Sequence, residues 1–254
     1  MRSSPILPSV LAAAALAAPL AAQVHEPRAC ISVSASGKAI ARADLAIVFL
    51  SARSSSPLAA DALEQNNRKV REVQAKLASL GYKEDQIRFS GNRFSPAGQG
   101  VYYGNRERPT GFDVYNNLYV YLDGADLKDV GTFNAKVSTL LDELSKLGAG
   151  PSTIPISSSS MGGSSVVAFT VKTPAAYEKQ AYQLAMEKAR PIAEDIAQRM
   201  KAQVTGIAAV NSSSVPRPVM GIATPLDEIP YEYLSSSLEE VPIRAGVNVC
   251  YSYK

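Results

Sequence analysis

The sequence predicts an α+β fold, with antiparallel or mixed sheets and helices packed on one face of them. Two observations favour this class. Several segments alternate apolar and polar residues with a period of two, as half-buried strands do, and three longer segments repeat apolar residues every three or four positions, as amphipathic helices do. Pairs of strands alternate with single helices along the chain. This order suggests two similar βαβ-type halves, over 30–123 and 124–254.

The first half begins with two strands and a helix. Residues 30–37 alternate apolar and polar side chains up to a glycine, and residues 44–53 are more continuously apolar. Residues 54–57 (SSSP) suit the cap and first turn of a helix, which we expect over 58–80. The apolar stripe of this helix has a single polar member, Asn66.

Two further strands are expected at 86–95 and 112–122, separated by a polar, glycine-rich loop. The second strand has one apolar face, and its other face carries Tyr115, Tyr119 and Tyr121. Packing across strands is the commoner use of such an aromatic stripe. Because the first face is already apolar, contact with a second subunit is an economical alternative. Binding of carbohydrate or peptide is a third.

The second half is expected to contain two helices. Asp126 should cap the first, which runs to residue 147. The second covers 174–201 and should kink at Pro191, because proline removes one main-chain hydrogen bond. The predicted inner face of the second helix comprises Tyr177, Ala181, Leu184, Ala185, Ala189, Ile192, Ile196 and Met200. The remaining strands are predicted at 152–160, where the pattern is weak, and at 165–172, 203–211 and 243–253.

Two connections, 96–110 and 212–241, are unusually long for simple loops. The second is rich in proline and serine, yet it contains too many apolar residues for a plain linker. We therefore predict that it packs on a neighbouring copy of the chain. The predicted oligomer interface comprises Tyr115, Tyr119, Tyr121, Met220, Tyr231 and Tyr233.

The first 22 residues are predicted to form an export leader. Arg2 supplies a positive charge, and residues 10–22 are small and apolar, too few to cross a bilayer, which needs about 20. Small residues before Gln23 suit cleavage by signal peptidase. We therefore expect one mature domain over 23–254, located in the periplasm, at the cell surface or secreted. No later segment is apolar enough to be an integral membrane span.

Charge and cysteine content narrow the possible partners and compartment. The formal net charge is +3, and the charged residues are interspersed without long runs of one sign. This pattern argues against a nucleic-acid partner and against a polybasic membrane patch. Cys30 and Cys250 lie near the two ends of the mature chain, each in a strand-like segment. In an oxidising compartment such a pair predicts a disulfide, and two buried free thiols are the alternative.

Residues suited to catalysis are scarce. The only histidine, His25, lies in a polar tail before the first strand, where it cannot serve in a fold-held triad or metal site. No phosphate-loop, zinc-protease or nucleophile-elbow motif occurs. Carboxylates are the one remaining route to acid–base chemistry, but ordinary turn positions and solvated ion pairs are the favoured explanation for them. The carboxylates considered are Asp44, Asp113, Glu187 and Glu194.

Several motifs occur in a distinctive order. They are Val33, Gly37, Ala43-Asp44-Leu45-Ala46, a helix closing at Leu80-Gly81-Tyr82, Asp85-Gln86-Ile87, Gly111-Phe112 followed by Asn116-Asn117, alanine at every fourth position from Ala181 to Ala197, and Val204-Thr205-Gly206. Over Cys30 to Tyr253 the chain thereby resembles the SIMPL-domain family, which includes a bacterial periplasmic immunogenic protein. The family's usual tyrosine is replaced here by Phe112. The resemblance implies an α+β fold, export, oligomer assembly in at least one relative, and no established catalytic residue.

We therefore expect an exported, non-enzymatic envelope protein that self-associates in the periplasm and needs no cofactor or metal. Peripheral association with the envelope is left open, and a part in stress tolerance is implied by the resemblance alone. The alternative hypothesis is a periplasmic binding module for a small ligand or peptide. An enzyme that uses carboxylates is a third hypothesis, which a buried acid pair in a pocket would support.

Overall fold

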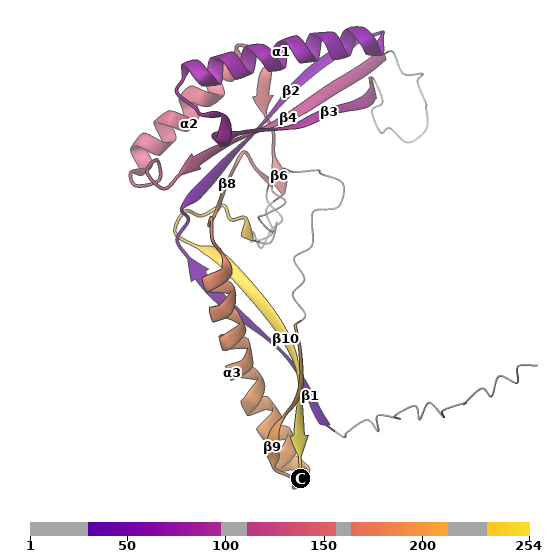
Figure 1. Ribbon diagram of the computed structural model, residues 1–254, viewed down its shortest axis with the longest axis vertical. Coiled ribbons are helices and arrows are strands. Elements are labelled where there is room, and N and C mark those ends of the chain that lie inside the picture. The colour runs from indigo at the N-terminus through magenta and orange to yellow at the C-terminus, as the bar shows by residue number, and fades with distance from the viewer. Residues whose placement is uncertain (1–29, 98–110, 156–163, 213–232) are drawn as a thin grey trace, which may run out of the picture.

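The computed structural model describes residues 30–97, 111–155, 164–212 and 233–254. Figure 1 shows an elongated molecule in two layered parts, a sheet covered by two helices and a sheet covered by one. The paired strands of the described residues are all antiparallel. The α+β class predicted from the sequence is confirmed.

The upper part is a sheet whose strands run in the order β3-β4-β2-β5, with β8 also pairing with β2. Two helices cover one face of it (Figure 1), and a short 3₁₀ turn precedes β3. The elements are β2 (Leu45–Ser56), α1 (Ala59–Ser79), the turn Glu84–Gln86, β3 (Ile87–Ala97), β4 (Gly111–Asp123), α2 (Val130–Ser145), β5 (Ala149–Pro151) and β8 (Val167–Thr170).

The lower part is a three-stranded sheet in the order β1-β10-β9, and α3 covers one face of it (Figure 1). Its elements are β1 (Cys30–Ala41), α3 (Ala175–Arg199), β9 (Val204–Ser212) and β10 (Val241–Tyr253). A two-stranded ribbon is made by β6 (Ile154–Pro155) and β7 (Ser164–Ser165). The first and last strands therefore pair with each other, and β2 carries the chain from the lower part into the upper one.

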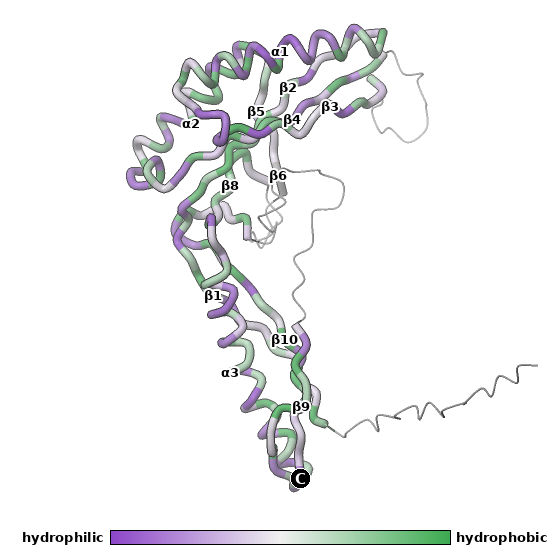
Figure 2. Tube along the Cα trace, in the orientation of Figure 1, coloured by the Kyte–Doolittle hydropathy of each residue, from purple (hydrophilic) through white to green (hydrophobic). Residues whose placement is uncertain are grey.

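The largest core lies between the upper sheet and its two helices. Alternate residues of β2 and β4 point towards α1 and α2, and Val73, Leu77 and Leu140 from the helices meet them. Figure 2 shows the corresponding concentration of apolar residues where β2 and β4 cross the centre of the sheet. The other face of β2 is also buried, through Ile47 and Phe49. This double burial explains why the segment is continuously apolar instead of alternating.

The lower core depends on small side chains of α3. Ala181, Ala185, Ala189, Ala193 and Ala197 are almost fully buried against β1 and β10. The prediction that Ile192 and Met200 line the inner face is wrong, since both side chains are exposed. Alanine at every fourth position lets the helix backbone approach the sheet closely, which leaves no room there for larger side chains.

Local sequence signals misplaced two features and placed a third correctly. Asp129, and not Asp126, caps α2, because its carboxylate accepts a hydrogen bond from Thr132 N at 2.7 Å. Ser54 to Ser56 continue β2, because they pair with Phe112 to Val114 of β4, and the sheet ladder outweighs their capping preference. Pro191 lies inside α3, as predicted, and the helix continues on both sides of it.

The two predicted halves are not confirmed as structural units. β1 of the first half pairs with β10 of the second, and β2 pairs with both β5 and β8. The predicted strand at 152–160 is described only to residue 155, and most of the predicted loop 212–241 lies outside the described residues. No helix of the described segments is both long and apolar enough to cross a membrane.

Candidate functional site

The tyrosine face of β4 is used partly inside the chain. Tyr119 is only 3% exposed, and its ring meets that of Phe49 edge-on, with centroids 5.6 Å apart. Tyr121 is half-buried in the same cluster, beside Leu234. Burial raises the pKa of Tyr121 to about 12. Packing between strands, the commoner use of such a stripe, thus accounts for Tyr119 and for much of Tyr121.

The other predicted interface residues, Tyr115, Met220, Tyr231 and Tyr233, do not form one surface among the described residues. Tyr233 is only 6% exposed, and its hydroxyl donates a hydrogen bond to Glu178 Oε1 of α3 at 2.9 Å. It therefore anchors the segment before β10 to the lower part. Met220 and Tyr231 lie outside the described residues. Tyr115 is half-buried near the beginning of β4 and belongs to a polar cluster.

That cluster, the Asp113 cluster, consists of Arg53, Ser55, Asp113 and Tyr115. Antiparallel pairing of β2 and β4 sets Ser55 opposite Asp113 and Arg53 opposite Tyr115, so all four side chains share one face of the sheet. Arg53 donates to Asp113 Oδ2 at 2.7 Å, Tyr115 donates to the same oxygen at 3.2 Å, and Ser55 donates to Oδ1. The Arg53 guanidinium also lies 5.3 Å from the centre of the Tyr115 ring.

These contacts decide what the Asp113 carboxylate can do. Its side chain is 5% exposed, and hydrogen bonds from Ser55 and Arg53 hold its pKa below the ordinary value. A general acid needs a raised pKa, so the cluster is built to keep this carboxylate ionised and fixed. The cluster therefore orders the ends of β2 and β4 and does not resemble an acid catalyst.

The other candidate carboxylates lie apart from one another. Asp44 accepts a hydrogen bond from Lys172 N at 2.7 Å, which holds the start of β2 against the end of β8. Glu194 forms an exposed ion pair with Arg190 at 2.9 Å. Glu187 lies on the surface of α3. Within the described residues, no group of three or more His, Cys, Asp or Glu side chains is placed to hold a metal ion.

Cys30 and Cys250 form a disulfide across β1 and β10. Ser32 pairs with Cys250 and Cys30 pairs with Ser252, so the bond joins diagonal neighbours on the face of the sheet away from α3. The Cα atoms are 5.5 Å apart, and the bridge closes a loop of 220 residues. The disulfide predicted from the sequence is thus present in the structure.

The open edge of β9 was not identified from the sequence. Among the described residues, β9 ends the lower sheet and pairs with β10 only. A register shift between Cys250 and Tyr251 places Ile207 opposite Tyr251 and Val210 opposite Val249, on the side of the sheet that faces α3. Ile207 and Val210 are nevertheless 53% and 49% exposed, because α3 packs mainly on β1 and β10 and touches β9 only slightly.

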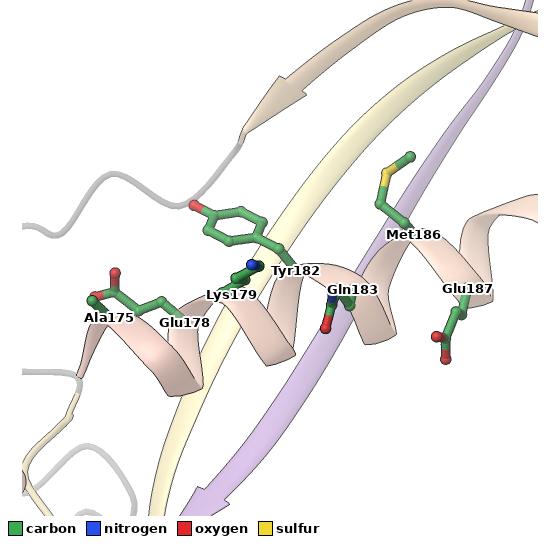
Figure 3. Close-up of a pocket in the computed structure, with 7 residues that line it drawn as sticks. All are labelled: Ala175, Glu178, Lys179, Tyr182, Gln183, Met186 and Glu187. Atoms are coloured by element: carbon green, nitrogen blue, oxygen red, sulfur yellow. The ribbon is translucent and has the colours of Figure 1, made fainter. Parts of the chain in front are cut away.

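A shallow depression of about 730 Å³ runs along the flank of α3. It is lined by Ala175, Glu178, Lys179, Tyr182, Gln183, Met186 and Glu187. Figure 3 shows the Tyr182 and Met186 side chains extending from the same side of the helix, whereas Glu187 extends from the opposite side. The Tyr182 hydroxyl lies 2.7 Å from Ser212 Oγ at the end of β9, so this flank borders the open edge.

Comparison with known proteins gives one assignment. Residues 31–251 match the family model SIMPL, which is described as a protein of unknown function (DUF541). No curated protein matches the chain. The matched range begins in β1 and ends in β10, so it takes in both parts of the fold.

Proposed function

The chain belongs to the SIMPL family, and on that premise we propose that it is an exported, non-enzymatic envelope protein that acts by self-association through the open edge of β9. The observation that carries the proposal is the exposure of Ile207 and Val210 on an edge strand that α3 does not cover.

Two features support export. Residues 1–22 have the charge and apolar pattern of a leader. The Cys30–Cys250 bond is of the kind that forms and persists in oxidising compartments. The processed protein would then work in the periplasm or at the cell surface, and a part in stress tolerance rests on the family resemblance. Recovery of the uncleaved chain from the cytosol would contradict export.

The composition of β9 supports pairing with a second copy. Exposed edge strands are usually protected by charge, proline or a covering element, because their free main-chain groups recruit other strands. β9 (VTGIAAVNS) contains neither a charged residue nor a proline over its nine residues. Two such strands can pair antiparallel over about 30 Å without bringing like charges together.

Pairing of this kind would also cover apolar surface. Ile207 and Val210 lie on the same side of the sheet as α3, with Met186 on the adjoining flank. In a symmetric pair, the two copies of β9 would join the two lower sheets into one sheet of six strands. Ile207, Val210 and Met186 of each copy would then lie between the two α3 helices. Among the residues predicted earlier, Tyr115 and Tyr121 keep partly exposed rings and remain candidates for a second contact.

The test is the mass of the processed protein in solution, measured by light scattering at two concentrations. We expect an assembly larger than one chain, which Ile207→Lys and Val210→Lys convert to monomer because a charge blocks strand pairing. Leu58→Lys is the matched control, since Leu58 is also an exposed apolar residue but lies before α1. A monomeric wild type rejects self-association, and an assembly insensitive to both β9 variants rejects this edge.

A further inference from the structure

We propose that a pocket beside the free end of β2 binds a small anionic ligand through a carboxylate or phosphate group. The pocket, here the edge pocket, has a volume of about 500 Å³. It is lined by Arg53, Ser54, Ser55, Gln65, Arg68, Lys69 and Glu72. Its volume suits a molecule of sugar size, since small-molecule sites span roughly 300–1,000 Å³.

The pocket exists because β5 is short. β5 pairs only with Leu50 to Ala52 of β2, and on that side no other described strand pairs with β2 beyond Ala52. The helix α1 continues past this point, and its residues Gln65 to Glu72 face the uncovered strand end. The result is a hollow between a strand edge and a helix.

The strand edge offers a main-chain donor to this hollow. Phe49 N donates to Val166 O, and Phe49 O accepts from Ser152 N, so odd-numbered residues of β2 direct their main-chain groups to the β5 side. A period of two then brings the N–H of Ser55 to the same side, where β5 has ended. Lys69 Nζ donates to Arg53 O, the preceding carbonyl on this edge. A free N–H beside cationic side chains is a favourable partner for an anion oxygen.

The charges of the pocket favour an anion. Two cationic side chains, Arg68 and Lys69, face it from α1, whereas Arg53 lines it from β2 with its guanidinium held on the opposite face of the sheet. Glu72 is the one carboxylate in its lining. Arg53 is already paired with Asp113, whereas no salt bridge to Arg68 is formed among the described residues. A guanidinium binds carboxylate and phosphate with two parallel hydrogen bonds, so Arg68 is the expected principal contact.

One polar group at the pocket is left unsatisfied by the fold. Ser54 lies in the pocket lining and is only 6% exposed. Its Oγ is buried and has no hydrogen-bond partner within the described part of the chain. Buried hydroxyls normally have a partner. Because the Oγ atom itself is buried, a water molecule ordered beneath the bound ligand would complete this hydrogen bond.

The test uses the full processed chain and four probes: inorganic phosphate, glucose 6-phosphate, glucuronate and neutral glucose. We expect saturable shifts of the Ser55 and α1 amide resonances with the anions and none with glucose. Whether phosphate or carboxylate binds tighter identifies the headgroup. Arg68→Ala should weaken binding by about tenfold or more, as loss of a two-bond arginine contact does.

The matched control is Arg71→Ala, because Arg71 is an exposed arginine of the same helix that lies outside the pocket lining. Binding by this variant should stay within about twofold of wild type, since Arg71 does not line the pocket and an exposed charge acts on a neighbour only weakly through water. Absence of saturable shifts with every anion, equal weakening by both variants, or equal binding of glucose would each overturn the proposal. None of these outcomes bears on self-association through β9.

Discussion

Gly37 of β1 lies directly against the main chain of Ala181 in α3. A Cβ atom placed on Gly37 would be 1.9 Å from Ala181 O and 2.7 Å from Ala185 N. The helix backbone, and not a flexible side chain, therefore occupies the space that any other residue would need. The alanine stripe of α3 permits this approach from one side, and the glycine of β1 permits it from the other.

Replacing Gly37 should destabilise the lower part strongly. Gly37→Ala forces β1 and α3 apart, and overpacking of this kind costs roughly 1–3 kcal/mol, with the upper end expected where backbone must move. The free energy of unfolding from urea titration measures the effect. Gly206→Ala is the control, because a Cβ on Gly206 of β9 meets no atom within 4 Å. Equal losses of unfolding free energy in the two variants would show that the close approach of β1 to α3 does not explain the effect.

Asn66 should hold α1 on the upper sheet. Its buried side-chain amide donates to Ala52 O of β2 at 3.0 Å and to Val114 O of β4 at 3.1 Å. Asn66→Ala removes both bonds and leaves a cavity, with an expected loss of about 1–3 kcal/mol in unfolding free energy. Asn67→Ala should cost clearly less, since Asn67 makes one exposed hydrogen bond, to Asn92. A negligible effect of Asn66→Ala would refute this role.

Asn66 also illustrates which parts of the fold can be predicted from the sequence. Its place in the apolar stripe of α1 was readable, and so was the alternation of β4, because both follow from local periodicity. The pairing of β1 with β10 was not readable, since residues more than 200 positions apart in sequence meet there. Periodicity identifies a strand but does not predict which other strand pairs with it.

The same limit explains what was missed at the candidate sites. The sequence marks β9 as a strand, but only its place at the end of the sheet makes Ile207 and Val210 exposed. Arg68 and Ser54 are ordinary residues of a helix and of a serine run, and the early end of β5 brings them to one pocket. The tyrosine stripe was visible, whereas the burial of Tyr119 depends on Phe49 of another strand.

The Cys30–Cys250 bond should stabilise the oxidised protein substantially. Linking residues 220 positions apart restricts the unfolded chain, with an upper figure of about 5 kcal/mol. We expect the unfolding midpoint of wild type to fall on addition of dithiothreitol. The double variant Cys30→Ser, Cys250→Ser should unfold at the lower midpoint with or without reductant. An unfolding midpoint of wild type that is the same with and without dithiothreitol would contradict a stabilising role for the disulfide.

The last prediction concerns pH and the Asp113 cluster. Hydrogen bonds from Ser55 and Arg53 lower the pKa of Asp113 in the folded protein, whereas in the unfolded chain it returns to about 3.9. The folded state therefore binds the proton less well than the unfolded state does. The stabilisation is fully present above the unfolded pKa and is lost as pH falls through the folded one. Asp113→Asn, which cannot ionise, should be less stable than wild type near neutral pH.

The difference in unfolding free energy between wild type and Asp113→Asn should narrow below about pH 4. There the wild-type carboxylate becomes protonated first in the unfolded state and then, at lower pH, in the folded state. Urea unfolding across pH 2.5 to 7, at about half-unit steps, measures this difference. Asp85→Asn serves as the control, because Asp85 is exposed and forms no salt bridge within the described residues. A gap between wild type and Asp113→Asn that is constant over this range would mean that the charge of Asp113 contributes nothing, and that only the shape of its side chain orders the ends of β2 and β4.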